Sequence, residues 1–187
     1  MTVLEETAAL LRSLRDVWDE EAVDELDHAL QSAARAIDDE ADDELVLAAA
    51  LHDLAHSPMF DATTAVEHDA AAEKWLSPRF GERVAWLAGR HVAAKRYLVA
   101  TEPGYGSTLT QTSVSSLDAQ GGAGVDATLV AHPWWPDALR LRRYDDGAKD
   151  PEAGPNGRAA TIEDVLTIAE RVVRQRESDW KSGRELS

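Results

Sequence analysis

The chain has 187 residues, a length that fits one domain and can bury a single substantial core. It contains no cysteine, so disulfides, thiolate catalysis and cysteine-ligated metals are excluded, and any metal must bind to His, Asp or Glu. The formal net charge of −16, from 35 acidic and 19 basic residues, argues against a surface that binds nucleic acid or an anionic membrane.

The sequence predicts neither export nor membrane insertion. The longest uninterrupted apolar run, residues 45–51, is far shorter than a membrane span, and the N-terminus lacks a basic segment followed by an apolar one. We therefore expect a soluble, cytoplasmic protein. The acidic surplus is typical of halophilic proteins, because a high-salt cytoplasm screens the repulsion between carboxylates.

Helical periodicity dominates the chain, and neither alternating strand patterns nor internal repeats are found, so we predict an all-α, single-domain fold over residues 1–187. Thr161 and Asp164 resemble a capping pair that begins the last helix. We predict a loop over 101–124 that holds a short helix near 113–119, and a polar connector over 147–158. The predicted helices are 7–18, 20–37, 43–56, 63–76, 78–98 and 161–178.

The apolar run 45–51 is followed directly by His52 and Asp53, with His56 one turn later. Seven consecutive apolar residues cover a helix on every side, so this helix is expected to be buried. A buried His–Asp pair must be hydrogen-bonded, ion-paired or metal-bound. Adjacent residues on a helix point about 100° apart, so His52 can bind one ion while Asp53 bridges to a second. A plain Asp–His hydrogen bond that closes the helix is the alternative.

The other histidines extend this candidate ligand set. His28 lies off the apolar arc of its helix, so on its own it is expected to be solvated. His68 and His91 lie beside apolar positions, and each on its own is expected to be a hydrogen-bonded interfacial residue. Taken together with His52 and Asp53, they form a candidate set of nitrogen and oxygen ligands. His132, next to two tryptophans, is expected to be structural.

Five stretches, in this order, resemble the HD-domain superfamily of metal-dependent phosphohydrolases and related oxygenases. The resemblance is closer to the oxygenase branch, in particular to the phosphonate-degrading HD-domain di-iron oxygenases, which are related to myo-inositol oxygenase. It implies an HD-domain helical bundle. The stretches are 26–31, 52–56, 90–98, 116–122 and 141–149.

This resemblance implies two iron ions with Asp53 as the bridging ligand. Nitrogen and oxygen ligands of this kind suit iron or manganese, with the ions about 3.5–4 Å apart. Asp145 is preferred over Asp146 because it lies four residues before Lys149, the spacing that the family shows; Asp146 is then a solvated neighbour or a hydrogen-bond acceptor behind the ligands. The implied metal ligands are His28, His52, Asp53, His68, His91 and Asp145.

Positive charge is concentrated in two stretches, 90–96 and 140–143, as an anion pocket in an acidic protein would need. Pairing with the acidic surface is the alternative for Arg90, Arg96, Arg140 and Arg143. Lys95 lies one turn after His91 and so shares its helix face. The resemblance implies that His56 and Lys95 are catalytic and that Arg142 offers a bidentate fork to a phosphonate. The implied substrate-binding residues are Glu21, His56, Lys95, Ser116, Gln120 and Arg142.

The implied reaction is the oxygen-dependent cleavage of the C–P bond of a 1-hydroxyalkylphosphonate, such as 2-amino-1-hydroxyethylphosphonate, with release of phosphate. Its partners would be a small anionic phosphonate and dioxygen, without nucleic acid or membrane. One alternative is a phosphohydrolase that uses manganese or magnesium to activate water against a phosphate ester. Another is a non-enzymatic, metal-bearing sensor. Trp18 stands where the family has an aromatic hydroxyl, which leaves its role and the exact substrate open. The sequence also leaves the oligomeric state open.

Overall fold

The computed structural model describes residues 1–18, 22–60 and 68–183. In these residues the chain forms α-helices and two 3-10 turns and no strand, which confirms the predicted all-α fold. The helices are α1 (Val3–Ser13), α2 (Glu25–Asp38), α3 (Asp43–Leu51), α4 (His68–Phe80), α5 (Glu82–Ala88), α6 (His91–Thr101), α7 (Gln111–Ala119), α8 (Ala127–Val130), α9 (Trp135–Gly147) and α10 (Ile162–Lys181), and the 3-10 turns are η1 (Leu54–His56) and η2 (Tyr105–Thr108).

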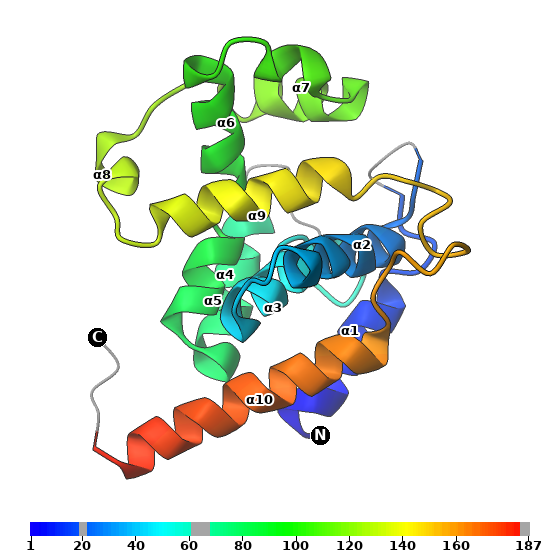
Figure 1. The fold of residues 1–187 in the computed structure, drawn as a ribbon, viewed down its shortest axis with the longest axis vertical. Helices are drawn as coiled ribbons and strands as arrows, with labels where there is room; N and C mark the ends of the chain where they lie inside the picture. The colour runs from blue at the N-terminus through cyan, green and yellow to red at the C-terminus, as the bar shows by residue number, and fades with distance from the viewer. Residues whose placement is uncertain (19–21, 61–67, 184–187) are drawn as a thin grey trace.

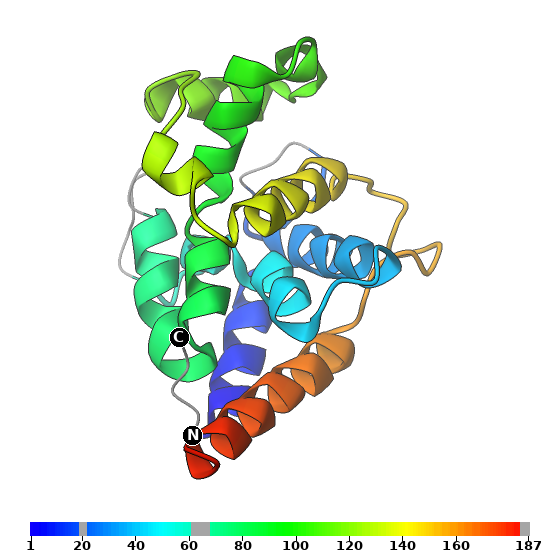
Figure 2. The ribbon, with the colours of Figure 1, turned by 60° about the vertical axis from the view of Figure 1, so that its left-hand side comes forward.

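Helix α3 forms the centre of the fold. It packs against α2, α5, α9 and α10, and α9 crosses over α2 and α3 on one side while α1 and α10 lie at the other end (Figures 1 and 2). Every residue from Leu45 to Leu51 is buried, which confirms the prediction from the apolar run. Because its side chains are apolar on all sides, α3 is stable only when it is surrounded by other helices.

Helix α3 ends earlier than the predicted helix over 43–56. His52 is its C-terminal cap, Asp53 follows outside the helix, and η1 covers Leu54 to His56. The His–Asp pair is therefore held at a helix end, where the backbone turns, and the two side chains lie against each other, with His52 Nε2 3.0 Å from Asp53 Oδ2.

The predicted helix over 78–98 is wrong as a single element, and its first break lies at Gly81. Helix α4 continues through Pro78 to Phe80, whose side chain is fully buried, so burial stabilises this last turn. Gly81 has a φ of +97°, a conformation that residues with a Cβ rarely adopt. The chain changes direction there and starts α5.

The second break in that segment follows Ala88. A Cβ on Gly89 would lie 2.9 Å from Oε2 of Glu73, so the backbone packs closely against α4 at this point. Helix α6 begins two residues later with His91. The break thus places a candidate ligand at the first position of a new helix.

Helix α9 is absent from the sequence prediction, although it lies next to the centre of the fold. Six of its thirteen residues are charged, which obscures the apolar periodicity. Two of the charged residues, Arg142 and Asp145, are nevertheless buried on the face that meets α2 and α6. A Pro in its first turn was an available start signal. The buried apolar residues of α9 are Trp135, Ala138, Leu141 and Tyr144.

The two predicted loop regions are confirmed. The short helix expected near 113–119 is α7, and a double-glycine turn at Gly121 and Gly122 ends it, with the Gly122 N–H bonded to the Leu117 carbonyl. The connector predicted over 147–158 contains no helix after Gly147, the last residue of α9, and it is anchored to α2, because the Gln31 amide exchanges two hydrogen bonds with the backbone of Asp150. The capping box of Thr161 and Asp164 at the start of α10 is present as predicted.

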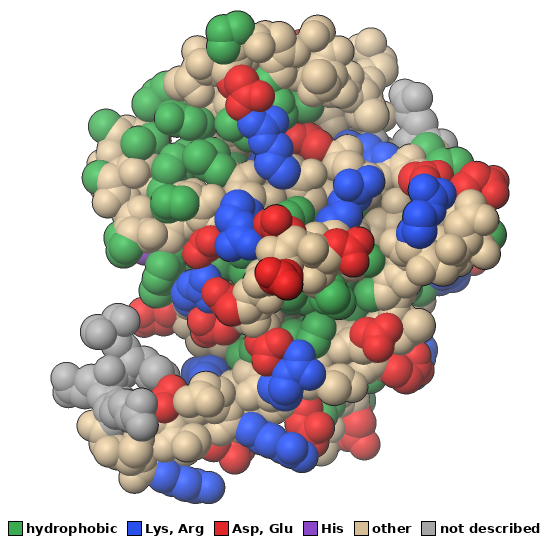
Figure 3. Space-filling view, viewed as in Figure 1, with side chains coloured by type: hydrophobic (Ala, Val, Ile, Leu, Met, Phe, Trp, Pro, Cys, Tyr) green, Lys and Arg blue, Asp and Glu red, His purple; other side chains and the backbone are tan. Residues whose placement is uncertain are grey.

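The surface carries its opposite charges side by side. On the face drawn in Figure 3, Lys and Arg side chains lie among Asp and Glu side chains rather than in one continuous basic patch. Arg171 pairs with Asp43, and Arg140 pairs with Asp39. Within the described ranges no helix combines the length and the apolar composition that crossing a bilayer requires.

The central position of α3 makes its side chains the most sensitive to truncation. We expect Leu47→Ala, at a fully buried position, to lower the free energy of unfolding by about 2–5 kcal/mol, because a cavity replaces the lost packing. The matched control is Ile37→Ala on α2, where 42% of the side chain is exposed, and its cost should stay below about 1 kcal/mol. Urea unfolding of the metal-free protein measures both, and equal losses would contradict the central role of α3.

Candidate metal centre and substrate pocket

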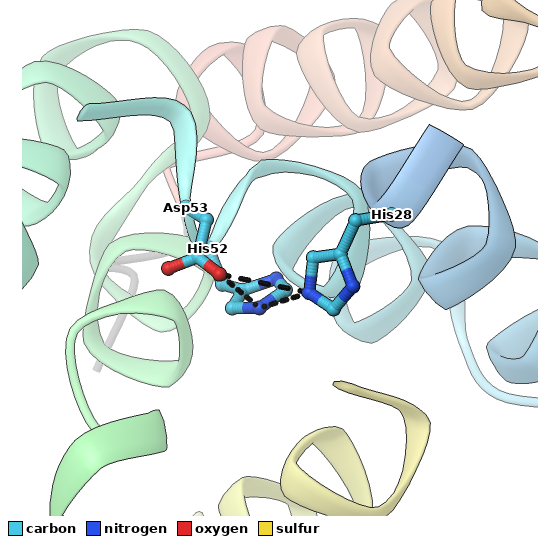
Figure 4. A group of neighbouring side chains, drawn as sticks. All are labelled: His28, His52 and Asp53. Carbon is cyan, nitrogen blue, oxygen red and sulfur yellow. Dashed lines mark hydrogen bonds and ion pairs between the residues drawn. The ribbon is translucent and has the colours of Figure 1, made fainter. Parts of the chain in front are cut away.

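Two elements bring His28, His52 and Asp53 together in the interior. His28 comes from α2, and the other two come from the end of α3; in Figure 4 the two rings and the carboxylate point toward one another. The expectation that His28 is solvated is wrong, because α9 covers the flank of α2 that its apolar arc leaves open. Both histidines are about 1% exposed.

The first half of the centre is a set of four side chains. The Nε2 atoms of His28 and His52 lie 3.4 Å apart, and the Asp53 Oδ2 atom lies 3.6 Å and 3.0 Å from them. From α9, Asp145 places Oδ1 3.5 Å from His28 Nε2 and Oδ2 3.6 Å from His52 Nε2. Four donor atoms at such separations can share one ion.

The second half uses the other oxygen of Asp53. Its Oδ1 lies 3.3 Å from Nε2 of His91 and 3.8 Å from Nε2 of His68, and these two nitrogens are 3.3 Å apart. His68 begins α4 and His91 begins α6, and both are buried. The two oxygens of Asp53 therefore face two different histidine pairs, as a bridging carboxylate requires.

The ring orientations fit metal binding. Nδ1 bonds to a backbone carbonyl in three histidines: His28 to Ala148, His52 to Ala49 and His91 to Ala88, at 2.8–3.0 Å. A carbonyl only accepts, so Nδ1 carries the proton and, in the neutral ring, Nε2 keeps a lone pair directed at the centre. The nitrogen and oxygen donors present thus fit two divalent ions, one on each side of Asp53.

The electrostatics of the centre favour added positive charge. Burial lowers the pKa of His52, but Asp53 and Asp145 outweigh it and raise the pKa to about 10. Burial likewise lowers the pKa of His68, and the neighbouring carboxylates raise it to about 9. Burial acts to raise the pKa of Asp53, yet the adjacent histidines hold it well below its usual range. The buried carboxylates therefore stay ionised and stabilise any cation placed between them.

Asp145, and not Asp146, joins the histidines. The Asp146 carboxylate lies on the far side of Arg142, where it accepts hydrogen bonds from that guanidinium and from the Tyr105 hydroxyl. This matches the acceptor role that the sequence left open for it. Burial acts to raise the pKa of Asp145, but Arg142 holds it well below its usual range.

The bidentate fork predicted for Arg142 is directed at protein carboxylates in this structure. Its Nη1 donates to Asp145 Oδ2 at 2.5 Å, its Nη2 donates to Asp146, and its Nε donates to Tyr105 Oη at 3.1 Å. A guanidinium has five N–H donors, so these bonds to described residues leave two for a ligand. Arg142 thus positions Asp145, and its contact with a substrate stays a prediction.

Lys95 lies next to the centre, close enough to interact with Asp145 and Asp53. It is buried, and its ammonium donates to Ser116 Oγ at 2.7 Å. Burial and the nearby Arg142 lower the pKa of Lys95 to about 8, while Asp145 and Asp53 oppose that shift. Lys149 also approaches, donating to Ser113 Oγ at 3.0 Å on the same helix as Ser116. Buried cations this close to one another are suited to an anion that neutralises them.

Comparison with known proteins adds relatives whose names carry an activity. The chain is 36% identical over 140 residues to hydroxymethylphosphonate dioxygenase of Gimesia maris, an alignment that covers 70% of each protein. It is 34% identical over 139 residues to (1-hydroxy-2-(trimethylamino)ethyl)phosphonate dioxygenase (glycine-betaine-forming) of Leisingera caerulea, which covers 69% of this chain and 70% of the relative. The chain belongs to the HD-domain phosphonate oxygenase family.

The comparisons also bear on the alternatives. Both named relatives are dioxygenases, so family membership makes this chain an oxygenase and disfavours the phosphohydrolase and the sensor. An uncharacterised protein of Acanthamoeba polyphaga mimivirus is 29% identical over 140 residues, which covers 69% of this chain and 64% of that protein. No family model matches the chain.

The remaining predicted site residues of this HD-domain oxygenase have varied positions. His56 lies at the rim, with Nε2 3.8 Å from Asp53 Oδ1 and its ring 5.0 Å from that of His68. Gln120 caps the C-terminal end of α7, four residues after Ser116. Glu21 lies outside the described residues. Trp18 has no oxygen, and 62% of it is exposed.

The two basic stretches contribute one buried residue each beside the centre, Lys95 and Arg142. For three of the others, the alternative of pairing with the acidic surface is confirmed: Arg90 binds Glu73, Arg140 binds Asp39 and Arg143 binds Glu102. Arg96 instead donates to the Gly122 carbonyl. His132 stacks on Trp86 with ring centroids 4.1 Å apart, in keeping with the expected structural role.

Sequence reasoning missed three residues at or beside the centre. Tyr105 is in the predicted loop, and no sequence signal marks it. In the sequence analysis, Lys149 serves only to choose Asp145 over Asp146. Asp69 directly follows a proposed ligand, His68, and its Oδ1 lies 3.0 Å from Nε2 of that histidine. Its adjacency to His68 parallels that of His52 and Asp53 and was a signal that could have found it.

The bridging position of Asp53 leads to a test by metal analysis. We expect the wild-type protein to hold two divalent ions per chain, and Asp53→Asn to hold fewer than one, because both halves lose an anionic donor. Inductively coupled plasma analysis after anaerobic loading with Fe²⁺ measures this. Asp118→Asn, an exposed change on α7, is the charge-matched control and should keep both ions. Full occupancy in Asp53→Asn would contradict the bridge.

Proposed function

We propose that this oxygenase binds two iron ions through His28, His52, Asp53, His68, His91 and Asp145, and that it uses dioxygen to cleave the C–P bond of a 1-hydroxyalkylphosphonate. The observation that carries the proposal is the division of the two Asp53 oxygens between two histidine pairs, next to the buried cations Lys95 and Arg142. Metals bound there would supply the redox and oxygen chemistry that no side chain provides.

The buried cations beside the centre support a phosphonate as the anionic substrate. A phosphonate group carries up to two negative charges, and Lys95 and Arg142 can contribute to neutralising them. Ser116 fixes the Lys95 ammonium by accepting its hydrogen bond. His56, at the rim, can donate to an outer phosphonate oxygen and hold the group in one orientation.

We include a hydroxyl group in the proposed substrate because the compounds in the names of both relatives carry one. Hydroxymethylphosphonate and the trimethylamino compound both carry a hydroxyl on the carbon bonded to phosphorus, and they differ in the other substituent. The substrate class proposed for this chain is therefore the 1-hydroxyalkylphosphonates, among which 2-amino-1-hydroxyethylphosphonate is a candidate. With its alcohol oxygen at the metals and its phosphonate group at Lys95 and Arg142, such a substrate would have its C–P bond between the two.

The proposed reaction fixes its stoichiometry. The carbon next to phosphorus is oxidised to a carboxylate, dioxygen is reduced, the C–P bond breaks and a P–O bond forms. One 1-hydroxyalkylphosphonate and one dioxygen thus give one carboxylate, one phosphate and one proton. Because the oxygen atoms balance without an added reductant, oxygen uptake and phosphate release should be equal.

The proposal is tested with the Fe²⁺-loaded protein, an oxygen electrode and a phosphate assay. Hydroxymethylphosphonate, 2-amino-1-hydroxyethylphosphonate and the trimethylamino compound serve as parallel substrates. We expect at least one to give equal oxygen uptake and phosphate release. Phosphate release from ordinary phosphomonoesters under strict anaerobiosis, with no oxygen uptake on any phosphonate, would establish the hydrolase instead.

The low pKa of Lys95 predicts a pH dependence. Lys95 is cationic below its pKa of about 8 and neutral above it, so phosphonate binding should weaken as the pH rises from 7 to 9. We expect KM to increase by up to about tenfold per pH unit above 8. Lys95→Met should have a KM raised about 10- to 100-fold at pH 7 and nearly constant to pH 9.

The control for this measurement is Lys74→Met, which removes an exposed lysine on α4. It should reproduce the wild-type pH profile, and both variants should keep the wild-type metal content. A Lys95→Met enzyme with the same rise of KM between pH 7 and 9 would assign the titration to another group.

A further inference from the structure

The carboxylate of Asp69 lies in the second half of the centre, and its Oδ1 atom has no hydrogen-bond partner among the described residues. Asp69 is the second residue of α4, and its side chain is 18% exposed, but its Oδ1 atom is buried. A buried carboxylate oxygen that lacks a donor is costly unless a cation compensates it.

The position of this oxygen matches that of a metal ligand. Asp69 Oδ1 lies 3.0 Å from His68 Nε2 and 3.5 Å from His91 Nε2. Those nitrogens and Asp53 Oδ1 are 3.3–3.8 Å from one another. Ligand atoms about 2.1 Å from one ion lie about 3.0 Å apart at adjacent octahedral positions and about 3.4 Å apart at tetrahedral positions. The donor atoms are therefore spaced as if around one ion.

The first half of the centre contains a carboxylate that only this half uses, and the second half has such a carboxylate only if Asp69 belongs to it. On the first side, His28 and His52 are joined by the shared Asp53 and by a carboxylate of their own, Asp145. On the second side, the six proposed ligands supply two histidines and the shared Asp53 only. Asp69 gives this side the same donor set as the other.

His56 is the other candidate for that fourth position. Its Nε2 lies 3.8 Å from Asp53 Oδ1, the same distance as that of His68, and its side-chain exposure of 21% is close to the 18% of Asp69. Asp69, in contrast, approaches the nitrogens of both histidines and carries the negative charge that a divalent ion requires. The geometry favours Asp69 and leaves His56 for the substrate.

We propose that Asp69 is a seventh protein ligand, which binds the second metal ion together with His68, His91 and Asp53. This inference rests on the metal pair of the proposed function. It gives each ion two histidines, one carboxylate of its own and one oxygen of the bridging Asp53. The opposing interpretation is that Asp69 is only an ion-pair partner of a protonated His68.

The test measures metal binding without phosphonate or oxygen. Metal-free protein is titrated with Mn²⁺ by calorimetry, and the bound ions are counted by elemental analysis after gel filtration. Wild type should bind two ions. Asp69→Asn should retain one and bind the second at least about 100-fold more weakly, because loss of a direct ligand exceeds the about 10- to 100-fold loss seen for groups that only orient ligands.

Three further variants serve as controls for this result. His91→Ala should also lose the second ion, which marks the effect of a missing ligand. His56→Gln and the exposed Asp118→Asn should keep both ions at wild-type affinity. Two tightly bound ions in Asp69→Asn, or loss of the second ion in His56→Gln instead, would overturn the proposal.

Circular dichroism of the metal-free proteins checks that the variants fold. Asp69→Ala is a second substitution at this position and should lose the second ion as Asp69→Asn does. A crystal structure of the Mn²⁺-loaded wild type decides the question without any variant. It should place an Asp69 oxygen within about 2.3 Å of the second ion. A water between Asp69 and that ion would overturn the proposal. Since no phosphonate is present, these outcomes stand apart from a failure of C–P cleavage.

Discussion

The structure depends on one buried carboxylate, that of Asp53, with its two oxygens facing two histidine pairs. An ionised carboxylate in a protein interior is unstable unless positive charge or hydrogen-bond donors surround it. Here the surrounding groups are mainly imidazole nitrogens, which lie 3.0–3.8 Å from its two oxygens. The helices that carry these histidines therefore converge on the carboxylate, an arrangement that fits two cations.

The ends of the helices contribute to this arrangement. His52 follows the last residue of α3, and His91 lies three residues after the last residue of α5; each bonds its Nδ1 to a carbonyl of the preceding helical turn. His28 bonds to the carbonyl of Ala148, the residue that caps α9. Each bond satisfies a carbonyl that the helix end leaves free and also fixes the ring with Nε2 toward the centre. Since helix C-termini carry partial negative charge, their position favours cations there.

An acidic surface and a cationic interior can coexist here because some basic side chains lie on the surface and others are buried. Outside, arginines such as Arg140 and Arg143 pair with neighbouring carboxylates and leave little free positive charge. Inside, Lys95 and Arg142 are buried beside the centre, where the lower effective dielectric strengthens their attraction for an anion. Arg142 contributes to the metal centre, because it holds Asp145 in place, and it also keeps N–H donors for a ligand.

The sequence by itself determined the all-α class, the burial of α3 and most of the candidate ligands. The run 45–51 has no polar face, so only a surrounded helix could bury it, and the ordered histidines and aspartates carry the family resemblance. Tertiary packing alone decided that His28 is buried, because α9 covers a flank that a helical wheel shows as polar. It also decided the breaks at Gly81 and Gly89, where backbone conformation and close packing override helical periodicity. Asp69 could be placed in the centre only by distances between side chains from separate helices, which no periodicity encodes.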